Sequence, residues 1–280
     1  MDNIDKLTMT EDDRFLLEYE LETGKDDCKV DLTQEVDRPP ICLSKGSKNY
    51  YTKYGMKEFP IPLATYGNFS FVQAPPKSFK TFFVSLLVGA YCGAGSEYVE
   101  DIKANRGGRH LLHFDTEQGK WHCQKVFMRV IDMIGTDIVP DYYHTFSLRE
   151  KGFNHRRNYI EFQLEKLSEE GDKAGLVVID GIADLVPDVN DLTYSNLIVQ
   201  WLMEITTKYD CHVITIIHSN YGSEKPTGHL GSLLEKKAET QFKLDRTEGG
   251  EVKVSCRRTR NTPFKDFKFA LNKQNLPQIF

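Results

Sequence analysis

The sequence lacks any run of eighteen apolar residues, so no segment is long enough to cross a bilayer as a helix. Residues 1–15 are acidic and lack the basic and apolar regions of a secretory signal peptide. The six cysteines are scattered and form no C-x-x-C pair, which argues against a structural zinc site and is typical of reduced thiols. We therefore expect a cytoplasmic protein without membrane contact.

An excess of positive charge is also missing, since the formal net charge is −5 at pH 7. Any contact with nucleic acid would therefore depend on a local basic patch. The length of 280 residues and the apolar content of 40% suit one large α/β domain with an appendage, or two small domains. We place a polar N-terminal arm of small elements at residues 1–58, interrupted at Lys45–Lys53, and the main domain at residues 59–280.

A P-loop is indicated after the first strongly apolar strand, although neither of its glycines is present. Phe69–Val72 has the composition of a buried strand, and the apolar stretch that follows Lys80 and Thr81 is long enough for a buried helix. This order matches G-x-x-x-x-G-K-[ST], in which the loop N–H groups and the helix N-terminus form an anion site. Ala74 and Phe79 replace the two glycines, so an ordinary strand–turn–helix connection is the alternative.

Three further apolar runs end in polar residues that belong to one pattern. The run at 110–114 is followed by Glu117, the run at 176–179 by Asp180, and the run at 212–217 by His218. Each residue alone is equally typical of a turn. Ligands of α/β sheets bind at the carboxyl ends of the strands, so the three residues and the Lys-Thr loop together predict a single site.

The remaining pattern alternates strands with helices. It closes with two paired strands, at Gln241–Arg246 and Glu251–Arg257, whereas Gly93–Gly108 is expected to be a loop. The sequence thus predicts an α/β fold, with a mostly parallel sheet, helices on both faces and an antiparallel hairpin at the C-terminal end.

From about residue 60 to residue 271, the order of motifs resembles the RecA-like P-loop ATPases. The motifs are FVQAPPKSFKT, HFDTEQ, LVVIDGIADL, VITIIHSN, GHLGSLLEKKAET and RRTRNTPFKDFKF. The likeness is to the plasmid-replication and replicative hexameric helicase branch, and most of all to ATPases carried on bacterial mobilizable elements. It implies a RecA-like core, ATP and Mg²⁺ as ligands, a ring or filament of identical chains, and DNA as a candidate partner.

The resemblance also implies roles for the site residues. Lys80 and Thr81 would contact the phosphates and Mg²⁺, and Asp180 would be the Walker B carboxylate that holds the metal. Glu117 would be the general base, at the end of the strand beside the P-loop strand, and His218 would sense the γ-phosphate. The implied nucleotide-binding segment consists of Ala74, Pro75, Pro76, Lys77, Ser78, Phe79, Lys80, Thr81 and Phe82.

Arg258 and Arg260 resemble the paired basic finger with which such ATPases reach the nucleotide of a neighbouring subunit. A solvated strand end and a contact to a phosphate backbone are the alternatives.

Three functions stay open. The first is an ATPase acting in replication, excision or transfer of a mobile element. The second is a non-catalytic RecA-fold module for DNA binding or assembly, its P-loop closed by Phe79. The third is a small-molecule kinase, although no acceptor pocket or lid can be placed in the sequence. Because Lys80, Thr81, Glu117 and Asp180 are all retained, we expect activity.

Overall fold

The computed structural model describes residues 15, 18–19, 30–219 and 225–280. Its contacts divide the chain into two units, Met1–Arg38 and Pro39–Phe280. Residues 1–14, 16–17 and 20–29 of the predicted arm lie outside the described residues. At 30–38 the backbone forms one short turn, with Asp31 Oδ1 accepting a hydrogen bond from Thr33 N at 2.9 Å. The boundary that the sequence predicts after residue 58 falls inside strand β2 (Gly55–Thr65) of the second unit.

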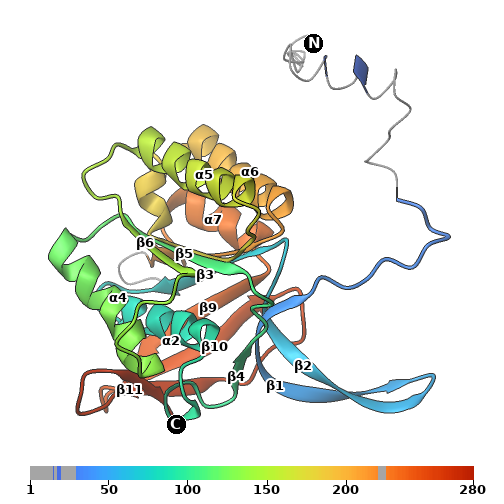
Figure 1. The fold of residues 1–280 in the computed structure, drawn as a ribbon, viewed down its shortest axis with the longest axis horizontal. Helices are drawn as coiled ribbons and strands as arrows, with labels where there is room; N and C mark the ends of the chain where they lie inside the picture. The colour runs from blue at the N-terminus through green and yellow to red at the C-terminus, as the bar shows by residue number, and fades with distance from the viewer. Residues whose placement is uncertain (1–14, 16–17, 20–29, 220–224) are drawn as a thin grey trace. The chain divides into compact units, whose positions relative to one another are not determined.

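The second unit is built around a nine-stranded sheet of order β12-β11-β10-β9-β3-β8-β7-β5-β6 (Figure 1). Six neighbouring strands are parallel: β9 (Thr240–Arg246), β3 (Phe69–Ala74), β8 (His212–His218), β7 (Ala174–Asp180), β5 (His110–Asp115) and β6 (Tyr143–Ser147). Antiparallel pairing adds β10 (Val252–Thr259), β11 (Phe267–Leu271) and β12 (Pro277–Ile279). The predicted fold class, including the C-terminal antiparallel hairpin, is confirmed.

Helices cover both faces of this sheet (Figure 1). One face carries α2 (Lys80–Cys92) and α4 (Lys120–Ile134), and the other carries α5 (Phe153–Glu169), α6 (Leu192–Lys208) and α7 (Gly228–Lys237). Strand side chains alternate between two cores: Phe69 and Phe71 pack on the α5–α7 side, whereas Val72 and Ala74 pack on the α2 side. Within the described ranges, no helix combines the length and apolarity needed to span a membrane.

A second, three-stranded sheet shows two errors in the sequence prediction. Its strands are β2, β1 (Ile41–Thr52) and β4 (Ile102–Ala104). An interruption is predicted at Lys45–Lys53, but β1 continues as far as Thr52, because cross-strand pairing with β2 overrides the local polarity. The predicted loop Gly93–Gly108 contains α3 (Ser96–Val99) and β4, whose pairing partner lies sixty residues earlier, at Leu43–Lys45.

The connection from β3 to α2 accommodates one of the two missing glycines without strain. Ala74 is the last residue of β3, and its strand conformation suits any residue. Phe79, the N-cap residue of α2, has a φ of 59° and a ψ of 27°, the left-handed conformation that favours glycine. Its ring packs on Phe82 with 5.5 Å between centroids, and the Arg246 guanidinium lies 5.3 Å from it. These contacts compensate for the backbone strain.

We expect Phe79→Gly to be more stable than Phe79→Ala by about 1 kcal/mol, because both lose the ring and only glycine relieves the left-handed backbone. Urea unfolding of the two variants measures the difference. At Phe82, inside the helix, the same pair is expected in the opposite order, since glycine there costs about 1 kcal/mol relative to alanine. Equal stability of the two Phe79 variants would contradict the strain.

Candidate active site

Four neighbouring strands end together at one edge of the sheet. Ala74 of β3 pairs with His218 of β8, and Asp115 of β5 pairs with Asp180 of β7, while β8 and β7 are themselves neighbours. Because these strands are parallel, the structure brings the β3–α2 turn, His218, Asp180 and the segment after Asp115 to the same edge. The carboxyl edge of an α/β sheet is where such folds bind their ligands.

The implied position of Glu117 is wrong in one respect. Its strand, β5, is separated from the P-loop strand β3 by β8 and β7, so it is not the neighbouring strand. Glu117 nevertheless lies close enough to act electrostatically on Lys80, His218 and Asp180. These residues therefore come together because their strands end at the same edge of the sheet, although β5 is not adjacent to β3.

Lys80 lies at the centre of the edge. Its ammonium donates a hydrogen bond to Pro75 O at 3.1 Å and lies 3.1 Å from His218 Nδ1. Burial lowers the pKa of Lys80, and the carboxylates of Asp180 and Glu117 oppose that shift. Burial, with Lys80 beside it, also lowers the pKa of His218, so a neutral imidazole accepts from the ammonium.

The loop before Lys80 is folded back on itself. Ser78 is buried, and its hydroxyl donates to Pro75 O at 2.7 Å, whereas Pro76 and Lys77 are exposed. Phe82 is turned to the flank of the helix, where the Arg129 guanidinium lies 3.7 Å from its ring. In the part of the chain that the structure describes, no side chain caps the N-terminus of α2, which leaves its first N–H groups available to an anion.

Thr81 and Asp180 face each other across the edge. The Thr81 hydroxyl is 3.5 Å from Asp180 Oδ2, at the limit of a hydrogen bond. Burial, and after it the carboxylates of Asp115 and Glu117, raise the pKa of Asp180 to about 7, although Lys80 and Thr81 act to lower it. A hydroxyl and a carboxylate are ligands that suit Mg²⁺, which commonly shares its coordination with substrate phosphates.

The donor set fits a shared magnesium ion better than a metal held by the protein alone. Among the residues that the structure describes, no group of three or more His, Cys, Asp or Glu side chains is placed to hold a metal. Thr81 and Asp180 would hold Mg²⁺ together with phosphate oxygens.

The segment that carries Glu117 is anchored by a residue to which the sequence analysis assigns no role. Asp115 is buried, and its carboxylate accepts hydrogen bonds from Glu117 N at 3.0 Å and from Gln118 N and Nε2, both at 2.7 Å. Thr116 Oγ1 accepts from Gly181 N at 2.8 Å and ties this segment to the end of β7. Glu117 itself is exposed above these anchors. The signal for this anchoring role in the sequence was an acidic residue at the end of a strand.

Two further polar residues at the edge were also missed. Gln73, buried in β3, donates to Ser219 Oγ at 3.1 Å and accepts from Gln241 Nε2 at 2.6 Å. A glutamine inside an apolar strand was a readable signal for this network. Arg246, at the end of β9, lies over the Phe79 ring and has no signal in the local sequence.

Arg258 and Arg260 are not brought to this edge. The backbone N–H of Arg260 donates to Glu239 O at 2.9 Å, and that of Glu239 donates to Phe69 O at 2.8 Å. Arg258, the register partner of Gln241, lies level with Phe71 in the middle of β3, and Arg260 lies level with the start of β3. The six residues of β3 place that level roughly 20 Å from the loop. The Arg260 guanidinium donates to Lys237 O at 2.7 Å, and Arg258 is exposed.

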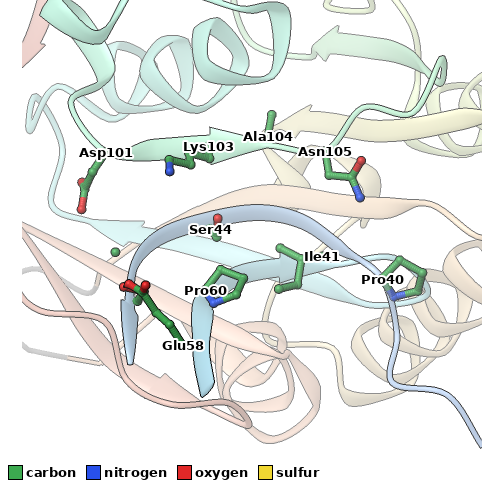
Figure 2. A pocket seen from close by; sticks show the side chains of 11 residues that line it. Pro40, Ile41, Ser44, Glu58, Pro60, Asp101, Lys103, Ala104 and Asn105 are labelled. Atoms are coloured by element: carbon green, nitrogen blue, oxygen red, sulfur yellow. The ribbon is translucent and has the colours of Figure 1, made fainter. Parts of the chain in front are cut away.

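A groove of about 830 Å³ lies elsewhere, between the β1–β2 hairpin and β4 (Figure 2). Glu58 and Pro60 line it from β2, Lys103 lines it from β4, and Asp101 lines it from the turn just before β4. It contains none of the residues gathered at the strand edge, and its mixed charges indicate no particular chemistry.

We expect Asp180→Asn to stabilise the metal-free, nucleotide-free protein at pH 8. A carboxyl whose pKa rises from 3.8 to about 7 on folding lowers stability as pH rises through that interval. Because one pKa unit corresponds to about 1.4 kcal/mol, the variant should exceed the parent by more than about 1 kcal/mol at pH 8 and match it closely below pH 4. Denaturant unfolding across pH measures this, with the exposed Asp188→Asn as control. A constant difference at all pH values would argue against a buried, titrating Asp180.

Comparisons with known proteins agree with this geometry. No curated protein matches the sequence. Among solved structures, a KaiC-like protein from the hyperthermophilic archaeon Pyrococcus horikoshii OT3 is similar in fold, with a TM-score of 0.53 and 12% identity over 77% of this chain and 90% of that chain. Residues 62–224, more than half of the chain, match the family described as AAA domain, and they include Lys80, Glu117, Asp180 and His218. The chain therefore belongs to the AAA domain family.

Proposed function

We propose that this protein is a Mg²⁺-dependent ATPase of the RecA-like type that works as a ring or filament in the replication, excision or transfer of a mobile element. One observation carries the enzymatic part, namely the meeting of Lys80, Asp180 and Glu117 at the ends of neighbouring parallel strands. An ammonium and two carboxylates around one position are what phosphoryl transfer from a triphosphate requires. The DNA setting rests on the sequence resemblance.

Binding would use the loop and the uncapped start of α2. Their N–H groups would receive the phosphates, and the Lys80 ammonium would exchange Pro75 O for a phosphate oxygen. Thr81 and Asp180 would hold Mg²⁺, which supplies neutralisation of charge on the phosphoryl oxygens. The raised pKa of Asp180 means that cation binding would also release a proton near neutral pH.

Hydrolysis would depend on Glu117. This exposed carboxylate stands on a segment fixed by Asp115, so it can orient a water and accept its proton without a large loss of conformational entropy. Neutral His218, in contact with Lys80, would respond to the γ-phosphate that draws the ammonium away.

We expect Lys80→Ala and Glu117→Gln to abolish turnover for different reasons. Lys80→Ala should lose nucleotide binding, whereas Glu117→Gln should keep it and lower kcat by about 100-fold or more. Phosphate release and titration calorimetry with ATP and Mg²⁺ separate the two effects. Glu150→Gln, another exposed glutamate, is the matched control. Hydrolysis at the parent rate in Glu117→Gln would refute the role of Glu117.

The alternative is a non-catalytic RecA-fold module for DNA binding or assembly. The observation in its favour is the left-handed Phe79, whose side chain stands where the family motif has glycine. Calorimetry on the parent protein decides between the two functions, because absence of heat at millimolar ATP and Mg²⁺ would favour the module.

The proposed finger would act on a neighbouring copy. Arg258 and Arg260 do not reach the edge that carries their own Lys80, so a role at a nucleotide requires a second subunit. Such a contact would stabilise charge on the transferring phosphoryl group only within an assembly.

We expect an equimolar mixture of Lys80→Ala chains and Arg258→Ala/Arg260→Ala chains to recover about a quarter of parental turnover, although each is inactive alone. In a random cyclic assembly, about one site in four would combine an intact lysine with an intact neighbouring arginine pair. Steady-state ATPase assays after subunit mixing measure the recovery, with Arg257→Ala as an active control. A mixture as inactive as its components would contradict action in trans.

A further inference from the structure

Among the described residues, no third strand pairs with the outer half of the β1–β2 hairpin, which extends away from the nine-stranded sheet (Figure 1). β4 pairs with β1 only at Leu43–Lys45, and beyond that point the residues of the ribbon are exposed at nearly every position. An unsupported two-stranded ribbon is at best marginally stable, so packing does not explain the side chains that it presents.

Those side chains are aromatic and basic. Tyr51 is 86% exposed and Tyr54 is 75% exposed. Three lysines, Lys48, Lys53 and Lys57, accompany them, and no aspartate or glutamate occurs between residues 46 and 57, although the whole chain has a net charge of −5. In the described parts of the chain, none of the three lysines forms an ion pair. The ribbon is therefore a local basic patch on an acidic protein.

The strand register places most of this charge on one face. Tyr50 pairs directly with Lys57, and Lys48 lies two residues before Tyr50, so all three share a face. The ammonium of Lys48 lies 5.5 Å from the Tyr50 ring centroid, and those of Lys53 and Lys57 lie 5.0 and 5.5 Å from the Tyr54 ring centroid. We call these five residues the lysine–tyrosine face.

The other face of the ribbon differs in character. Tyr51 pairs with Met56 there, and Glu58, which follows on the same side, lines the groove of Figure 2 and bonds to Ser47. The lysine–tyrosine face instead adjoins the arginine-bearing end of β10, since the Tyr50 hydroxyl bonds to Thr262 Oγ1, close after Arg260. Positive charge thus continues from the ribbon onto the sheet edge.

We propose that the lysine–tyrosine face binds single-stranded nucleic acid. Each ring has an ammonium over it, so a base that takes the place of the ammonium can stack on tyrosine while the displaced lysine meets its phosphate. Only unpaired bases offer their faces for stacking, which favours a single strand over a duplex. The proposal rests on the proposed function for its DNA setting, whereas the binding itself needs no ATP.

The test uses the full chain and a fluorescein-labelled oligothymidylate of about twenty nucleotides, without ATP or Mg²⁺, across about 50 to 200 mM KCl. Fluorescence anisotropy is expected to show that Lys48→Gln/Lys57→Gln weakens binding at least tenfold at the lowest salt. The slope of log K against log salt should fall by about 1.4, or about 0.7 for each phosphate that a lysine no longer neutralises. Tyr54→Ala should lose about tenfold through stacking.

Two matched controls come from the same region. Lys103→Gln removes an exposed lysine from β4, and Tyr51→Ala removes an exposed tyrosine from the other face of the ribbon; both should bind within about twofold of the parent. Thermal melting checks that each variant stays folded. Basal ATP turnover of the ribbon variants is expected to equal that of the parent.

Three results would overturn the proposal: no binding by the parent at the lowest salt, undiminished binding by the lysine variant, or equal losses in Tyr51→Ala and Tyr54→Ala. Binding to phosphatidylglycerol vesicles but not to the oligonucleotide, abolished in the same lysine variant, would assign the face to a membrane and overturn it too. A parent protein that binds the oligonucleotide but hydrolyses no ATP would defeat the proposed function and leave this inference standing.

Discussion

The buried carboxylate of Asp180 is the constraint on which the strand edge depends. Asp180 stands in register with Asp115, close to Glu117, and Lys80 is the cation that opposes this charge. Together the burial and the two carboxylates raise the pKa of Asp180 to about 7. A divalent cation would neutralise part of this negative charge, so the binding of a metal-bound triphosphate would also stabilise the fold around it. The electrostatics of the edge thus favour a ligand that brings a divalent cation.

Buried hydrogen bonds hold the segments that carry the polar residues of this edge. Asp115 and Thr116 anchor the Glu117 segment, and Gln73 joins the P-loop strand to Ser219, directly after His218. Such buried polar networks stabilise one arrangement because an unpaired member is costly. The exposed carboxylate of Glu117 therefore stands on an ordered segment, as its proposed role in aligning a water molecule would require.

Local composition predicted the elements of the sheet better than their neighbours. Three strands of the parallel core, β5, β7 and β8, are short apolar runs with a polar residue at or just after the end, so these strands and the positions of Glu117, Asp180 and His218 could be predicted from the sequence. The order of the strands could not be predicted, because it depends on pairing between distant segments, and Glu117 was assigned to the wrong neighbour for that reason. The continuation of β1 beyond Ser44 was not predicted either, because its polar residues are held in a strand by pairing with β2.

Strand β9 connects the strand edge that carries Lys80 with the part of β10 that carries Arg258. Chemistry at the first could therefore affect contacts at the second. Gln241 of β9 bonds to Gln73 of the P-loop strand, and its register partner in β10 is Arg258. Glu239, just before β9, accepts hydrogen bonds from Thr65 N at 2.9 Å and Asn261 Nδ2 at 2.6 Å, and so ties the hairpin to the arginine-bearing segment. A shift of Ser219 with the nucleotide would thus reach the basic edge through two side-chain hydrogen bonds and a strand pairing. The proposed hydrolysis and the proposed binding of a nucleic-acid strand could then be coupled without a moving loop. Such coupling would need only two packing arrangements of β9, one of which the nucleotide favours.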